Sequence, residues 1–360
     1  MNILIEATFF KFEFITGIER HFLLQLEIID NSKRFDRIFV VTTRNIPNGL
    51  IQTKTPVEVI TIDSNSKEAW EEIYKTYHFD VLYSTFEPPE LLPDNNIPVL
   101  YVLHDSGRYL FPDMMEKGVL DKHISNFEKY IQRENFYILT VSESSKNDIV
   151  KLFPNISRKI FVVYNFISNH LLENKIAPTP PTGELESNKF YLMIGRYMPI
   201  KNTLIVVKAF QNRSSTFENY SLVILGRKGW YDEFDKFVET THDRNIKLYD
   251  FISDESLTWL YQNCYALVNA SLYEGFGLPL IEAAAFDCKR IMCSDIPVFR
   301  EILPNATVFF EPNNQTQIEN LLFEQQYEER GFSNEIKTKF SLEKSTSQLL
   351  NILNQITTHE

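Results

Sequence analysis

The chain has 360 residues, of which 44% are hydrophobic, and it carries a formal net charge of −12. This length and apolar content predict two globular domains and exclude a disordered protein. Neither half of the sequence is basic, which argues against a nucleic-acid-binding domain.

The first half of the sequence alternates short apolar segments with amphipathic ones. The apolar segments are rich in Ile, Val, Leu, Tyr and Phe, residues that favour β-strands. Strands that alternate with helices predict a parallel sheet built from βαβ units. We expect strands at residues 2–8, 37–43, 80–85, 98–103, 137–141 and 159–164, and helices at 18–30, 119–134 and 144–153.

Residues 171–188 interrupt this alternation with three prolines, a glycine and no periodicity, which predicts a linker. The alternation then resumes and ends with an amphipathic helix at 342–356. We expect strands near 190–195, 219–225, 246–249, 265–268, 289–293 and 307–310, with helices near 202–213, 231–240, 254–263, 278–286 and 315–328.

This pattern predicts an α/β fold of two doubly wound, Rossmann-like domains that face each other across a cleft. In such sheets, ligands bind at the carboxyl ends of the strands. Candidate site residues should therefore directly follow strands.

The segment Ser271–Glu301 carries the most informative pattern in the sequence. Glu274 precedes a glycine-broken turn, Gly275–Gly277, and Glu282 follows it on an apolar run that predicts a helix. The first N–H groups of a helix and its dipole bind phosphate or other anions. A carboxylate placed there can hold the hydroxyl groups of a sugar. The two features together indicate a nucleotide-sugar as the ligand.

The second predicted domain opens with a strand that runs into a cationic loop. Arg196 and Lys201 flank a proline-stiffened turn at the carboxyl end of this strand. Arginine can clamp a diphosphate with a bidentate fork, and lysine adds a point charge. The alternative is a solvated loop with two ordinary surface cations.

Two further strand ends in this domain offer weaker candidates. One strand is followed by Gly226 and Arg227, where a glycine permits a ligand to approach the backbone closely. Another is followed by Phe251 and Ile252, whose backbone could read the edge of a nucleobase. A plain turn explains the first pair equally well, and helix capping by Ser253 explains the second segment.

The first predicted domain contributes candidates at three of its strand ends. His104 follows a strand and can donate a hydrogen bond to a sugar hydroxyl, and Gly17 precedes a helix start. Phe86 and Glu87 lie on a proline-rich loop that would suit a sugar acceptor, as would Asp105. A structural histidine, a simple helix start and a proline-rich turn are the alternative readings.

The order of these motifs resembles that of retaining glycosyltransferases with the GT-B fold, specifically glycosyltransferase family four. YEGFGLPLIEA is similar to the E-x7-E element of that family and lies downstream of the matching Arg196 and Lys201. The loop at Asp287–Lys289 departs from the family's small Gly-x-Pro turn, and Asn165 lacks the glycine that usually follows it. The supporting matches run in the family's order from about residue 14 to 312 and are TGIERH, LPDNNIPVLYVLHD, VSESSKNDI, GRYMPIKN, ILGRKGW and FISDESL.

The resemblance implies roles for these residues. Arg196 and Lys201 would bind the donor diphosphate, and Glu282 would hold the ribose hydroxyls. Glu274 and His104 would contact the donor sugar. The predicted catalytic residues are therefore Glu274, His104, Arg196 and Lys201. Further donor contacts would come from Gly17, Gly226, Arg227, Phe251, Ile252, Gly275, Phe276, Gly277 and Leu278, and acceptor contacts from Phe86, Glu87 and Asp105.

The implied enzyme is a retaining glycosyltransferase that moves a hexose from a nucleotide-diphosphate sugar to a saccharide or a lipid-linked saccharide. The motifs are most similar to those of bacterial O-antigen and capsule transferases, which favours GDP-mannose and polysaccharide synthesis. The resemblance implies no metal and no cofactor, with GDP or UDP as the bound product. The last helix would cross back onto the first domain. Residues 1–170 and 342–360 would then form the acceptor domain, and residues 189–341 the donor domain.

Two other classes share this fold. A GT-B sugar-nucleotide epimerase would use different carboxylates, and a non-catalytic partner subunit would be expected to lack Arg196, Lys201 or Glu282. The start of the sequence lacks the basic region of a signal peptide, and no apolar run reaches the roughly 18 residues of a membrane span. Cys264, Cys288 and Cys293 are expected to be buried free thiols. A cytoplasmic protein with at most peripheral membrane contact is therefore expected.

Overall fold

The structure, a computed structural model of the chain, divides into two compact units. Unit 1 comprises Met1–Leu110, Lys117–Phe166 and Phe340–Glu360, and unit 2 comprises Phe111–Glu116 and Ile167–Lys339. The described residues are 1–12, 17–86, 88–94, 96–114, 119–172, 178–181, 185–195, 198–213, 215–227, 232–305, 308–324 and 333–357.

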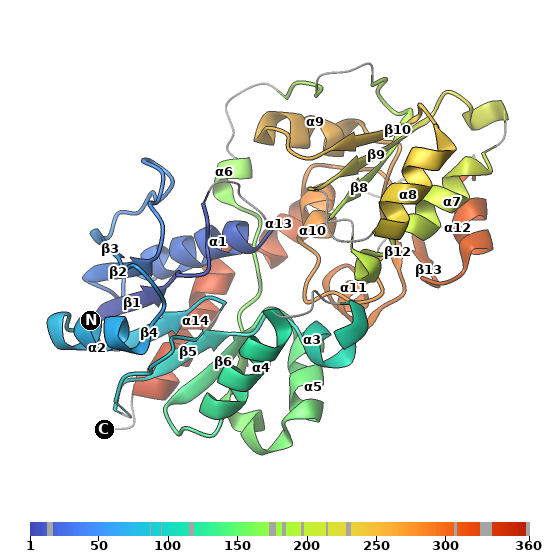
Figure 1. Cartoon of the computed structure of the whole chain (residues 1–360). Coiled ribbons are helices and arrows are strands. Elements are labelled where there is room, and N and C mark those ends of the chain that lie inside the picture. Colours follow the sequence, from blue (N-terminus) through green and yellow to red (C-terminus); the bar gives the residue numbers. More distant parts are fainter. Residues whose placement is uncertain are drawn as a thin grey trace. The chain divides into compact units, whose positions relative to one another are not determined.

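Unit 1 is built on a parallel sheet of seven described strands in the order β3-β2-β1-β4-β5-β6-β7 (Figure 1). Such an order, with the chain reversing direction beside β1, is typical of a doubly wound α/β sheet. The strands are β1 (Asn2–Glu6), β2 (Arg37–Thr42), β3 (Val57–Thr61), β4 (Val81–Ser84), β5 (Val99–Val102), β6 (Phe136–Thr140) and β7 (Ile160–Val162).

Helices follow β1, β3, β5 and β6, whereas loops join β2 to β3 and β4 to β5. Every residue of β4 and β5 is buried, as expected for central strands covered on both faces. Ser66 and Ser142 each cap a helix by accepting a hydrogen bond from a backbone N–H in its first turn. The helices are α1 (Gly17–Asn31), α2 (Lys67–Thr76), α3 (Gly107–Leu110), α4 (Val119–Tyr130) and α5 (Glu143–Leu152).

The helix α14 (Leu342–Thr357) returns from the end of unit 2 and packs beside α1 (Figure 1). Its apolar side, including Leu349 and Leu353, is buried. Polar contacts fix its position: Asn31 Nδ2 donates to Thr346 Oγ1 at 3.0 Å, and Ser345 Oγ donates to the Tyr164 carbonyl at 2.8 Å. The end of the described chain therefore completes unit 1.

Unit 2 repeats the architecture with six described parallel strands in the order β10-β9-β8-β11-β12-β13. The strands are β8 (Phe190–Ile194), β9 (Ser221–Leu225), β10 (Ile246–Tyr249), β11 (Ala266–Asn269), β12 (Ile291–Ser294) and β13 (Val308–Phe310). The helices are α6 (Asn169–Leu172), α7 (Thr203–Gln211), α8 (Asp232–Thr241), α9 (Asp254–Asn263), α10 (Leu278–Ala285), α11 (Pro297–Ile302), α12 (Gln315–Leu322) and α13 (Ser333–Lys339).

These two sheets confirm the predicted α/β class with two Rossmann-like domains. The strand β3 was not predicted, and the helix expected at 119–134 corresponds to α4, which ends at Tyr130. Unit 2 also takes in Phe111–Glu116, which the predicted division had assigned to the first domain. The three cysteines are buried free thiols, as predicted. No helix in the described part of the chain is long and apolar enough to span a membrane.

Candidate donor site

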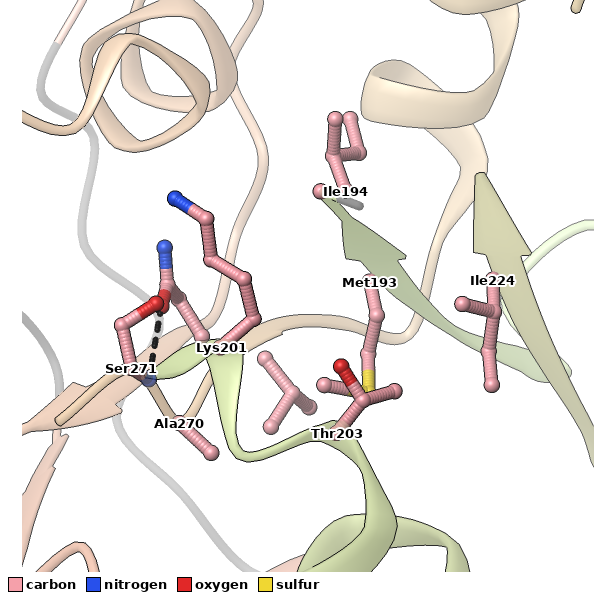
Figure 2. Close-up of a pocket in the computed structure, with 10 residues that line it drawn as sticks. Met193, Ile194, Lys201, Thr203, Ile224, Ala270 and Ser271 are labelled. Atoms are coloured by element: carbon pink, nitrogen blue, oxygen red, sulfur yellow. Dashed lines mark hydrogen bonds between the residues drawn. The ribbon is translucent and has the colours of Figure 1, made fainter. Parts of the chain in front are cut away.

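A pocket in unit 2 lies at the carboxyl ends of β8, β9 and β11 (Figure 2). The strand order reverses between β8 and β11, which is where doubly wound sheets bind ligands. In Figure 2, Lys201 and Ser271 lie on one side of the pocket and Ile194 and Ile224 on the other. The lining residues are Met193, Ile194, Gly195, Lys201, Thr203, Ile224, Val268, Asn269, Ala270 and Ser271.

The loop after β8 brings Lys201 to this pocket. Gly195 leaves the strand with a φ of +151°, and the stem of Lys201 packs 3.7 to 3.9 Å from where a Cβ of residue 195 would lie. Asn202 then takes a left-handed conformation and donates from Nδ2 to the Pro312 carbonyl at 2.7 Å. These contacts fix the lysine on the pocket side of the loop. Arg196, its predicted partner, lies outside the described residues.

Lys201 and Glu274 form an ion pair with 2.6 Å between Nζ and Oε1, and both side chains are largely buried. Ser271 Oγ donates to the same carboxylate oxygen at 2.8 Å. The backbone of Ser271 is held in turn, because its N–H donates to Asn269 Oδ1 at 3.1 Å, as the dashed line in Figure 2 shows. The structure thus brings together two of the predicted residues, and it adds Ser271 and Asn269, which the sequence analysis did not single out.

The turn after Glu274 ends at the start of α10. Gly277 precedes that helix with a φ of +107° and provides no side-chain cap for its first N–H groups. A Cβ at Gly277 would lie 2.8 Å from Cε1 of the fully buried Phe299. Glycine is therefore required here both by the backbone conformation and by the space available. The result is a helix N-terminus of the kind that binds anions.

Glu282 lies on the buried side of α10 and is only 5% exposed. The fully buried Tyr261, on α9, donates from its hydroxyl to Glu282 Oε2 at 2.7 Å. The Tyr261 ring stacks in turn on Phe286, with 6.0 Å between centroids and 6° between planes. A buried carboxylate needs such a donor, because burial without hydrogen bonds is costly. The E-x7-E spacing predicted Glu282 as a site residue but gave no signal for Tyr261.

The other predicted residues of unit 2 follow strands, as expected. Gly226 comes directly after β9 with a φ of +150°, and the neighbouring Arg227 is exposed. Phe251, which comes after β10, is 47% exposed, and Ile252 beside it is half-buried. Gly275 and Phe276 are buried in the turn before α10, and Leu278 is the first residue of that helix.

In unit 1, the predicted residues lie at the ends of β4 and β5. His104 Nε2 lies 3.4 Å from the Thr85 carbonyl oxygen, and the Phe86 ring is 6.4 Å from the His104 ring. Asp105 Oδ1 accepts a hydrogen bond of 2.7 Å from the Gly107 N–H at the start of α3, so it has a capping contact. Gly17 is the first residue of α1, and Glu87 lies outside the described residues.

A second histidine, which the sequence analysis missed, lies against the first. The His21 and His104 rings are 4.2 Å apart and nearly perpendicular, and His21 Nδ1 is 2.9 Å from Asn165 Oδ1. Burial lowers the pKa of His104 to about 4, and burial together with the nearby His104 lowers the pKa of His21. Both rings are therefore neutral at neutral pH. The only signal in the sequence was a histidine four positions after Gly17 on the same helix.

Comparison with known proteins agrees with this geometry. Residues 179–331 match the family model described as Glycosyl transferases group 1. The O-antigen chain mannosyltransferase RfbU of Salmonella typhimurium is 30% identical over 229 residues, which cover 61% of this chain and 60% of the relative. The O-antigen chain mannosyltransferase B of Escherichia coli is 28% identical over 238 residues, covering 59% and 62%. The chain thus spans about three fifths of the length of these relatives.

Solved structures extend the likeness to both units. Anabaena HepE in complex with UDP and glucose matches with a TM-score of 0.69 and 17% identity, covering 99% of this chain and all of HepE. WaaG, a glycosyltransferase involved in lipopolysaccharide biosynthesis, also has a TM-score of 0.69, at 15% identity and 99% coverage of this chain. At such identities the likeness concerns the fold, which is the GT-B fold of two Rossmann-like domains.

Replacing Gly277 by alanine should destabilise unit 2, because the new Cβ would collide with Phe299 and the backbone conformation disfavours a side chain. We expect a loss of about 1–3 kcal/mol in the free energy of unfolding, measured by urea denaturation. Gly49→Ala is the matched control, since Gly49 also has a positive φ but its Cβ would meet nothing within 4 Å. Equal losses in the two variants would contradict the proposed collision.

Replacing Tyr261 by phenylalanine removes one hydrogen bond to the buried carboxylate of Glu282 while keeping the ring stack. We expect a loss of stability of about 1–3 kcal/mol and, if Glu282 binds ligand, weaker nucleotide binding in calorimetry. Tyr191→Phe is the control, because the buried Tyr191 hydroxyl donates to a backbone carbonyl, that of Leu322, and not to Glu282. That variant should lose stability without losing nucleotide affinity.

Unfolding should become easier in mild acid because of His104. Its pKa in the folded protein is about 4, so between that value and the unfolded pKa of about 6.5 only the unfolded chain binds the proton. Stability therefore falls as the pH decreases, by about 1 kcal/mol from His104 between pH 7 and pH 5.5. Urea midpoints at the two pH values measure this, and His104→Asn should reduce the difference. His78→Asn, at an exposed site, should leave it unchanged.

Proposed function

We propose that this protein is a retaining glycosyltransferase that moves a hexose from a nucleotide-diphosphate sugar to a saccharide acceptor. The observation that carries the proposal is the ion pair between Lys201 and Glu274 at the pocket of unit 2, directly before the N-terminus of α10. A cation, a carboxylate and a helix N-terminus suit the three chemical parts of such a donor. The glycosyl transferases group 1 match of residues 179–331 supports the same conclusion.

The donor would lie across these groups in a definite order. Its diphosphate would take Lys201 as a counter-ion, together with Arg196 and the amides at Gly275–Leu278. Glu274 would then be released from the lysine to accept hydrogen bonds from hydroxyls of the donor sugar. Donor binding thus exchanges one partner of an existing ion pair for another, and the Glu274 carboxylate keeps hydrogen-bond donors.

The nucleoside would occupy the other end of α10. Glu282 is oriented by Tyr261 and would accept hydrogen bonds from the ribose hydroxyls. Gly226, Arg227, Phe251 and Ile252 follow the neighbouring strands β9 and β10, and they would surround the diphosphate and the base. In unit 1, Gly17 would lie near the phosphates, and His104 would contact the donor sugar with its neutral ring.

The reaction breaks the bond between the anomeric carbon and the diphosphate oxygen and forms a bond from that carbon to an acceptor hydroxyl. In a same-face mechanism the hydroxyl proton passes to an oxygen of the departing diphosphate. Negative charge grows on the diphosphate as the bond breaks, so Lys201 and the α10 amides would stabilise the transition state more than the ground state. These protein charges would serve in place of a metal ion.

The mannosyltransferase relatives favour GDP-mannose as the donor and a growing surface polysaccharide, such as an O-antigen or capsule, as the product. The acceptor would be a saccharide or a lipid-linked saccharide, bound by unit 1 through Phe86, Glu87 and Asp105. GDP would be the released product, or UDP if the donor is a uridine nucleotide. We further propose a cytoplasmic location, with at most peripheral membrane contact.

One experiment tests the proposal directly. The protein is screened by thermal shift against GDP-, UDP-, dTDP- and ADP-sugars, and the stabilising donor is then incubated with saccharide acceptors. We expect a glycoside with the anomeric configuration of the donor, assigned by NMR, formed equally well in the presence of EDTA. An epimerised sugar from donor alone would identify an epimerase, an inverted product would contradict retention, and loss of product in EDTA would contradict metal independence.

Replacing Lys201 by glutamine removes the proposed counter-ion of the leaving diphosphate. We expect kcat to fall by about 10²–10³, the range seen when one group that stabilises transition-state charge is removed. Lys201→Arg should recover only part of the rate, because a planar fork replaces a point charge.

The matched control for this variant is Lys208→Gln, which removes a partly exposed lysine of α7 that is 4.0 Å from Glu233. It should turn over normally. Undiminished turnover in Lys201→Gln would contradict the assignment of Lys201 to the diphosphate.

A further inference from the structure

The loop after β1 turns one aromatic ring outward. Phe10 and Phe12 are buried and pack against Phe22 of α1, with 5.0 and 5.8 Å between the ring centroids. Phe9, in contrast, is 37% exposed and is among the few large apolar side chains of unit 1 that reach solvent. The adjacent rings of Phe10 and Phe12 fill the core at this loop, and Phe9 lies at the surface.

Phe9 lies on a second ring, which the structure holds firmly. Its centroid is 4.2 Å from that of Phe86, with 31° between the planes. The Phe86 carbonyl accepts a hydrogen bond of 3.1 Å from the Tyr101 hydroxyl, and the preceding Thr85 donates from Oγ1 to the Glu6 carbonyl at 2.8 Å. These bonds tie together the carboxyl ends of β1, β4 and β5, which are neighbours in the sheet. Phe9 is therefore part of a rigid aromatic surface.

A cation adjoins the same surface. The Arg108 guanidinium carbon lies 4.6 Å from the centroid of the Phe86 ring, and the arginine is only partly exposed. Among the described residues, no carboxylate forms an ion pair with Arg108. An arginine stacked on an aromatic ring keeps its N–H donors directed along its plane, where they can bind an oxyanion with two hydrogen bonds.

We propose that Phe9, Phe86 and Arg108 form the acceptor subsite of unit 1 and that it binds a pyranose ring carrying an anionic group. The apolar C–H face of the sugar would pack on Phe9, and its phosphate or carboxylate would pair with Arg108. The ring of His104, a predicted contact of the donor sugar, is 6.4 Å from that of Phe86. This inference rests on the proposed function, and it adds the stacking residue and the charge of the acceptor.

Charge complementarity selects this occupant. A purely apolar partner would leave the partly buried cation of Arg108 without a counter-ion, and a purely ionic ligand would not need the exposed ring of Phe9. A sugar with an oxyanion satisfies both groups at once. The stack also pre-orders the site, because two packed rings lose little freedom when a ligand binds.

The test uses the whole protein and saturation-transfer NMR with three probes at millimolar concentration: methyl α-mannoside, mannose 1-phosphate and methyl glucuronide. We expect both anionic probes to bind about tenfold more tightly than the neutral one, a difference that one charged hydrogen bond can supply. With the donor site saturated by the nucleotide that stabilises the protein in thermal shift, Phe9→Ala should abolish the response to all three probes. Arg108→Gln should remove only the preference for the anionic probes. A preference for one anion over the other identifies phosphate or carboxylate as the natural group.

Val59→Ala is the matched control, because Val59 is also an exposed apolar residue of unit 1, at 44%, and it lies on β3. It should leave all three responses unchanged. Thermal-shift binding of the nucleotide-sugar is measured in parallel with every variant. If Phe9→Ala binds the nucleotide normally and also keeps its saccharide response, the subsite is wrong while the donor assignment stands. The subsite is equally wrong if wild-type protein binds none of the probes. If wild-type protein binds no nucleotide-sugar in the thermal-shift measurement, the proposed function is wrong.

Discussion

The ion pair between Lys201 and Glu274 is the constraint on which the candidate donor site depends. It joins the loop after β8 to the loop after β11, the two strands between which the order of the sheet reverses. Both side chains are largely buried, so each charge is stabilised by the other while no ligand is present. The pair keeps the pocket preformed and holds Glu274 beside the turn that begins α10. A ligand that supplies an anion for the lysine and hydroxyl groups for the carboxylate can replace both halves of the pair.

Much of this site was predictable because its chemistry is local in sequence. The spacing of Glu274 and Glu282 around a glycine turn already defines a helix start with an acid on either side. The partners of these acids were not predictable, because they come from other elements. Ser271 and Tyr261 are ordinary residues in the sequence, and only the packing of α9 against α10 makes Tyr261 the hydrogen-bond donor of a buried carboxylate. The pairing of His21 with His104 likewise depends on the fold.

The fold shows the same division between local and non-local information. Central strands such as β4 and β5 are continuous apolar runs and were recognised as strands. The strand β3 lies at the edge of the sheet, and only one of its five residues, Ile60, is buried. Its alternation of apolar and polar residues is short, and pairing with β2 decides its structure. Edge elements of this kind are fixed by their neighbours more than by their own composition.

The path of α14 has a consequence for the order in which the protein acquires its structure. Unit 1 contains the first residues of the chain, yet its contact between α1 and α14 needs a helix that follows all of unit 2. During synthesis, domains generally fold as units as they emerge from the ribosome. Unit 2 therefore has its whole sequence available earlier than unit 1 does. The side of α1 that contacts α14 therefore stays uncovered until residues 342–357 have been synthesised.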